Sequence, residues 1–99
     1  MELSEINNKL KSITEELPPK IKELKNLELA YNKRFYYCMV HSGMGNQAQR
    51  EAEATLTCDQ EGLWEPLLEV RSDVRILYME KDMYIEISKN LRVIQNDIP

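Results

Sequence analysis

The sequence has few of the residues that interrupt helices or build sheets. Only three glycines and four prolines stand among its 99 residues, and no stretch alternates apolar and polar residues for long enough to predict a strand. No apolar run approaches the roughly 20 residues that a membrane-spanning helix needs. These shortages predict an all-α protein that does not enter a membrane.

Residues suited to catalysis or metal binding are equally scarce. His41 is the only histidine, and neither a nucleophile motif nor a Gly-rich phosphate loop accompanies it. Cys38 and His41 stand one helical turn apart, and a hairpin would bring Cys58 to the same level, which is one arrangement for a tetrahedral metal site. The alternative is that both cysteines are small core residues. We favour this alternative, and we expect no metal, no cofactor and no enzymatic activity.

Two rows of apolar residues repeat every seven positions, which is the spacing of a coiled-coil seam. They stop on either side of residues 41–46, the only stretch that holds two glycines. The simplest folding of this pattern is a long antiparallel helical hairpin, coiled-coil-like, with an N-terminal helical segment. The first row is Leu3, Leu10, Leu17, Leu24, Tyr31 and Cys38, and the second is Leu56, Leu63, Val70, Leu77, Tyr84 and Leu91.

Prolines set the expected helix boundaries within this single domain. Pro18 and Pro19 each remove a backbone donor, and Pro19 also disfavours helical geometry at Pro18, so a break is expected there. A kinked continuous rod is the alternative, because the first seven-residue row passes through the prolines in phase. The expected ranges are 1–99 for the domain, 1–17 for an N-terminal helix, 19–41 for a second helix, 42–46 for a turn, and 47–96 for a C-terminal helix or two helices broken near 62–66.

The turn between the rows carries recognisable capping residues. Gly43 or Gly45 suits the left-handed geometry that closes a helix. Asn46 is a good N-cap for the helix that follows, and Gln49 then stands at its third position, which approximates a capping box. Pro66 would stand in the first turn of a new helix, where proline costs little.

The chain has more aromatic and methionine side chains than one seam between two helices can cover. Tyrosine, tryptophan and methionine are enriched at protein interfaces. We therefore expect assembly into a helical bundle as a homo-oligomer, a dimer or higher, or a surface that binds a protein partner. The predicted partner-binding residues are Tyr36, Tyr37, Met39, His41, Met44, Asn46, Gln49, Arg50 and Trp64.

The charge balance disfavours general nucleic-acid binding, which needs a basic face. The net charge is −4, and residues 48–99 hold eleven acidic against six basic residues. A local basic row beside aromatic residues is nevertheless compatible with a phosphate backbone and stacked bases. Nucleic-acid binding is thus an alternative, and its predicted residues are Lys20, Lys22, Lys25, Lys33 and Arg34.

Residues 41–54, with their Gly-containing turn and Arg-Glu-Ala run, and residues 87–92 resemble small helical proteins encoded by tailed bacteriophages of Gram-positive bacteria. The resemblance implies a phage or prophage accessory protein that acts inside the host cell. Together with the surplus of interface residues, it leads us to expect a non-enzymatic protein that binds and modulates a host or phage protein of DNA metabolism or defence. A small DNA-binding protein of phage replication or recombination is the alternative. The start of the chain shows no pattern of a signal peptide, so the expected location is the bacterial host cytoplasm.

Overall fold

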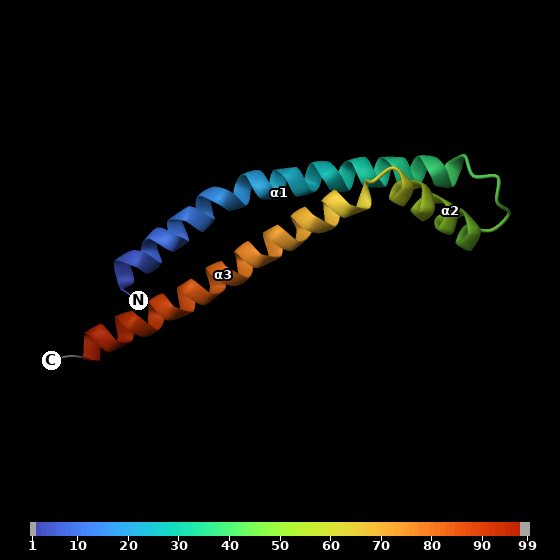
Figure 1. Ribbon diagram of the computed structural model, residues 1–99. Coiled ribbons are helices and arrows are strands. Elements are labelled where there is room, and N and C mark those ends of the chain that lie inside the picture. The colour runs from blue at the N-terminus through green and yellow to red at the C-terminus, as the bar shows by residue number, and fades with distance from the viewer. Residues whose placement is uncertain (1, 98–99) are drawn as a thin grey trace. The chain divides into compact units, whose positions relative to one another are not determined.

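Three α-helices make up nearly all of the described chain (Figure 1). The structure is a computed structural model that describes the backbone of residues 2–97 and the side chains of residues 2–94. The helices are α1 (Leu3–Val40), α2 (Gln47–Gln60) and α3 (Trp64–Asp97), and the residues described contain no strand. The predicted all-α class is therefore confirmed, while the first residue and the last two residues of the predicted domain lie outside the described residues.

The helices are shared between two compact units. Unit 1 joins Met1–Ile21 with Ser72–Pro99, so the N-terminal part of α1 lies beside the C-terminal part of α3. Unit 2 is Lys22–Arg71 and contains the rest of α1, all of α2 and the beginning of α3. In each unit, α1 packs antiparallel against α3, as the predicted helical hairpin requires.

Each unit has a small core. In unit 1, Ile6, Ile13, Leu17, Val74 and Ser88 are buried. In unit 2 the buried residues are Ala54, Cys58, Leu67 and Val70. All six residues of the first seven-residue row are buried or half-buried, so this row is the seam of α1.

The predicted break at Pro18 and Pro19 is wrong, because both prolines lie inside α1. Both are exposed, so water can reach the carbonyl groups of the preceding turn that lose their intrahelical donors. Leu17, beside them, is only 5 % exposed, and its burial favours the unbroken seam. One helix therefore replaces the two that were expected over 1–17 and 19–41.

The connection between α1 and α2 is held by polar side chains. Asn46 Oδ1 accepts a hydrogen bond from the Gln49 backbone N–H at 2.8 Å, which confirms the predicted N-cap. Ser42 Oγ accepts one from the Met44 N–H at 3.1 Å and donates one to Glu53 at 2.5 Å. Because these bonds shape the connection, it needs no left-handed glycine, and the expectation of such geometry at residue 43 or 45 is wrong.

The left-handed residue is instead Gly62, with φ of 71°, between α2 and α3. The Gly62 N–H donates to the Asp59 carbonyl at 3.0 Å, and the Leu63 N–H donates to the Cys58 carbonyl at 3.1 Å. These two bonds form a Schellman motif that ends α2. The predicted alternative of two helices broken near 62–66 is thus the observed one, and Pro66 stands in the first turn of α3 as expected.

This break changes the helical phase between α2 and α3. The second seven-residue row continues correctly through Leu63, Val70 and the later members, which are buried or half-buried. Its first member, Leu56, is 57 % exposed, whereas Ala54 and Cys58 are buried in its place. The prediction for Leu56 is therefore wrong, because the row was extended through a turn that interrupts the helix.

Candidate protein-binding surface

An ion pair fixes the end of α2 against α1 in unit 2. Arg34 Nε donates to both carboxylate oxygens of Glu61, at 3.0 and 2.8 Å, and Arg34 Nη2 donates to Oε1 at 2.6 Å. These hydrogen bonds raise the pKa of Arg34 and lower the pKa of the Glu61 carboxyl group. Because this two-pronged geometry is specific to arginine, the pair sets the position of the α2 terminus along α1.

The same arginine also orients aromatic side chains near the end of α1. The Arg34 guanidinium lies over the Tyr37 ring, 5.4 Å from its centroid. Tyr37 in turn contacts His41, with ring centroids 4.3 Å apart. Tyr37 and His41, two of the predicted partner-binding residues, are exposed. Each nevertheless contacts another side chain of α1 or of the residue that follows it.

Trp64 belongs to a second aromatic cluster rather than to an open surface. Its ring lies 5.5 Å from that of Tyr31, which is stacked on Phe35 at 6.1 Å. The Arg71 guanidinium lies over the Trp64 ring, 5.7 Å from its centroid, and pairs with Glu28 at 3.7 Å. Burial raises the pKa of the Tyr31 hydroxyl. Trp64 is half-buried here, and its contacts are those of a core residue that joins α3 to α1.

Several other predicted partner-binding residues also make intramolecular contacts. Met39 is half-buried. Asn46 caps α2 with its side chain, and Arg50 Nε donates to the Met44 carbonyl at 3.1 Å. Asn46 and Arg50 thus shape the connection before α2.

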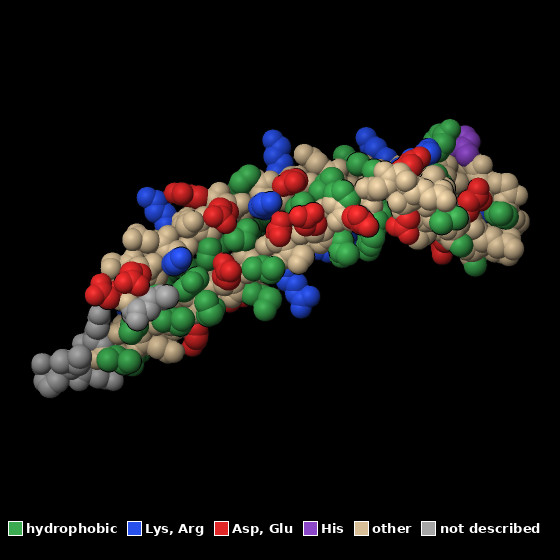
Figure 2. Space-filling model, in the orientation of Figure 1, with side chains coloured by type: hydrophobic (Ala, Val, Ile, Leu, Met, Phe, Trp, Pro, Cys, Tyr) green, Lys and Arg blue, Asp and Glu red, His purple; other side chains and the backbone are tan. Residues whose placement is uncertain are grey.

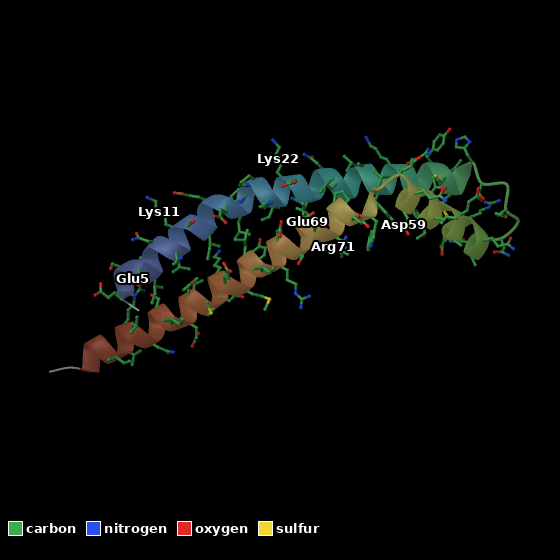
Figure 3. All side chains as sticks on the ribbon, in the orientation of Figure 1. Glu5, Lys11, Lys22, Asp59, Glu69 and Arg71 are labelled. Atoms are coloured by element: carbon green, nitrogen blue, oxygen red, sulfur yellow. The ribbon has the colours of Figure 1, made fainter. Side chains whose placement is uncertain are left out.

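A row of exposed residues follows the side of α1 that faces away from the described parts of α2 and α3. Tyr36 is 71 % exposed, and Leu29 and Val40 are also more than half exposed. Figure 3 shows Lys22 pointing away from the side on which Glu69 and Arg71 lie. Steps of three and four residues place the whole row on one helical face, which we call the outer face of α1. Its members are Lys22, Lys25, Leu29, Lys33, Tyr36 and Val40.

The outer face was only partly found from the sequence. Tyr36 was predicted as a contact residue, but Leu29 and Val40 were not. The signal that could have found them is the seven-residue spacing from Leu29 to Tyr36, followed by four residues to Val40, outside the seam.

The predicted basic row is divided between two faces. Lys22, Lys25 and Lys33 are exposed on the outer face. Lys20 instead pairs with Asp73 within unit 1, at 3.4 Å, and Arg34 pairs with Glu61. Only three of the five residues of the nucleic-acid alternative therefore share a surface, and in Figure 2 basic side chains project along α1 among acidic ones.

A second open surface lies on α2. Met44 and Leu56 line a groove of about 340 Å³ together with Gln49, Ala52 and Glu53. Met44 and Gln49 were predicted as contact residues, whereas Leu56 was assigned to the seam. Met44 and Leu56 are each about half exposed, so both present apolar surface to solvent.

The sulfur and nitrogen ligands considered for a metal site do not form one cluster with the carboxylates. Cys58 is buried and Cys38 half-buried, both as free thiols, and burial raises the pKa of the Cys58 thiol. Within the described part of the chain, no three His, Cys, Asp or Glu side chains are placed to hold one metal ion. The same residues include no helix with the length and apolar character needed to cross a membrane.

Comparison with known proteins returns no relative. No family model, no curated protein and no solved structure matches the chain. The resemblance to phage proteins stays a prediction, and the functional interpretation rests on the geometry of the surfaces.

Proposed function

We propose that the protein is a non-enzymatic binding module that holds another protein on the outer face of α1. The observation that carries this proposal is Tyr36, a large side chain that is 71 % exposed in line with Leu29 and Val40 on one helical face. An exposed apolar row with polar flanks is typical of a protein-binding surface. Tyrosine is also among the residues that most often dominate binding energy.

The lysines of the same face define the chemistry of the partner. Lys22, Lys25 and Lys33 lie in the same row as the apolar residues of α1, so the surface is complementary to one that combines apolar and acidic side chains. A partner helix with apolar residues spaced by three and four positions, and with Asp or Glu beside them, fits both properties. The resemblance stated above supports a host or phage protein of DNA metabolism or defence as its source.

The test uses a synthetic helical peptide with a leucine ridge and glutamate flanks. Fluorescence anisotropy is expected to show binding to the full chain, and Tyr36→Ala is expected to weaken it about tenfold, which corresponds to about 1.4 kcal/mol. Leu56→Ala is the matched control, since it removes an apolar side chain that is also more than half exposed, at 57 %, from α2. The same variants are compared in copurification from cells of the bacterial host.

Nucleic-acid binding is the competing outcome of the same experiment. A labelled DNA duplex is titrated at about 50 mM and about 200 mM salt, because phosphate binding weakens steeply over that range. Salt-dependent DNA binding that is lost in Lys33→Ala and kept in Tyr36→Ala would refute the protein-binding proposal. The proposal would also be refuted if the peptide does not bind and no protein copurifies in a way that depends on Tyr36.

A further inference from the structure

α3 has a second apolar stripe within unit 1, separate from its core seam. Ile76, Met79, Met83 and Ile94 are each about half exposed or more, and Ile87 is half-buried between them. With 3.6 residues per turn, this face lies roughly a third of a turn away from the seam of Val74, Leu77 and Tyr84. Hydrophobic side chains reach the surface over α3 in Figure 2. The stripe belongs to unit 1 and is distinct from the outer face of α1.

The shape of the stripe fits a helix as its occupant. From Ile76 to Ile94 the facing positions alternate steps of four and three residues, which is the spacing that receives the knobs of another helix. Ile76, Met79, Glu80 and Met83 line an open groove of about 330 Å³. The stripe extends over 19 residues, about 27 Å of helix. The facing positions are Ile76, Glu80, Met83, Ile87, Asn90 and Ile94.

We propose that this stripe binds the same stripe of a second copy of the chain, with the two α3 helices antiparallel. The two-fold axis passes beside residue 85. Ile76 then faces Ile94 of the second copy, and Met83 faces Ile87. Glu80 faces Asn90, whose amide donates a hydrogen bond to the carboxylate. Two copies of unit 1 become a four-helix bundle.

The chemistry of the facing residues selects this arrangement. Spacing alone is uninformative, because any two heptad rows match when one is reversed. In the proposed register, apolar residues face apolar residues and polar residues face polar ones at every position. A shift by one heptad would place Glu80 against Met83 or Asn90 against Ile87, and parallel helices would place Glu80 against Glu80. A buried polar position that specifies register is a known property of coiled coils.

The flanks of the stripe support the same register at one position and oppose it at another. Met79 and Val93, which are 61 % and 58 % exposed, stand beside the stripe and meet each other across the two copies. Glu86 meets Glu86 of the second copy beside the axis, and like charges at that position weaken the dimer. This unfavourable pair provides a test of register, because its removal strengthens only an arrangement that brings the two Glu86 residues together.

Cross-linking tests the direction and register of the helices. Chains that carry Ile76→Cys are mixed with chains that carry Ile94→Cys, both in a Cys38→Ser background, while Cys58 is buried. Oxidation is expected to give mainly a disulfide between positions 76 and 94. Disulfides formed mainly between two copies of position 76 would show parallel helices and overturn the proposal.

Sedimentation equilibrium tests the face itself. The natural chain is expected to dimerise, Met83→Glu to raise the dimer dissociation constant at least about tenfold, and Glu86→Gln to lower it. The matched control is Tyr78→Glu, which places the same charge on a different face of α3. A chain that is monomeric at about 100 µM, or a dimer that Met83→Glu leaves intact, overturns the proposal. Tyr36→Ala is expected to leave the dimer unchanged, so this proposal and that of a peptide-binding α1 face can fail independently.

Discussion

Pro19→Ala is expected to increase the free energy of unfolding by about 2 kcal/mol. Pro19 lies inside α1 and is exposed, so its missing N–H leaves the Glu15 carbonyl without an intrahelical donor. A proline in a helix interior costs about 3 kcal/mol relative to alanine. The proline also restricts the unfolded chain, which is worth about 0.4–1 kcal/mol in the opposite direction. The net gain for alanine is therefore about 2 kcal/mol.

Urea unfolding followed by far-UV circular dichroism measures this change, and thermal unfolding should show a rise in Tm of about 10 °C. The control is Pro66→Ala, because a proline in the first turn of α3 replaces no intrahelical donor. It is expected to change stability by less than about 1 kcal/mol. If the chain instead broke at the prolines, Pro19 would begin the second helix and Pro19→Ala would be destabilising. A loss of stability in Pro19→Ala would thus refute the continuous α1.

Three further predictions concern the core, the turn before α3 and the loss of stability at low pH. Leu67→Ala should destabilise by about 2–5 kcal/mol in urea, because Leu67 is 2 % exposed, whereas Leu68→Ala, at a half-exposed neighbour, should cost under about 1 kcal/mol. Gly62→Ala should cost about 1–2 kcal/mol from its positive φ, and Gly43→Ala, which has open space and ordinary φ, should not destabilise. The lowered pKa of Glu61 gives stability that is present above its unfolded value of about 4.3 and is lost as the pH falls through the folded value. Glu61→Gln should therefore make the fall in the urea midpoint between about pH 5 and pH 3 shallower; an unchanged slope contradicts this role.

Most of the seam and the N-cap of α2 were predictable because they depend on local spacing and chemistry. Leu17 is buried at its position in the row. Asn46 caps α2 by accepting a hydrogen bond from a backbone N–H only three residues further along the chain. Neither feature needs knowledge of the partner helix. The all-α class follows from the same local signals, since few residues interrupt them.

The candidate surfaces were less predictable, because exposure depends on which faces the helices cover. Tryptophan is a residue type that is common at protein interfaces, yet Tyr31 and Arg71 pack around Trp64. Arg34 has the charge expected of a phosphate contact, yet a carboxylate 27 positions away in the chain accepts its hydrogen bonds. The continuity of α1 through its prolines was only the alternative prediction for a related reason, since tertiary packing of the seam outweighs local preference.

The buried Ser88 has a consequence for how the chain opens. In unit 1 one seven-residue row on the side of α3 that faces α1 contains Val74, then the half-buried Lys81, then the buried Ser88, so this row becomes polar toward the C-terminal end. Local unfolding begins where few apolar contacts oppose it, and we therefore expect amide hydrogen exchange to be fastest in the last turns of the helix. A second copy bound along the neighbouring stripe would slow that exchange by mass action. The protection of these amides would then depend on protein concentration, while that of the turns around Leu67 would change less.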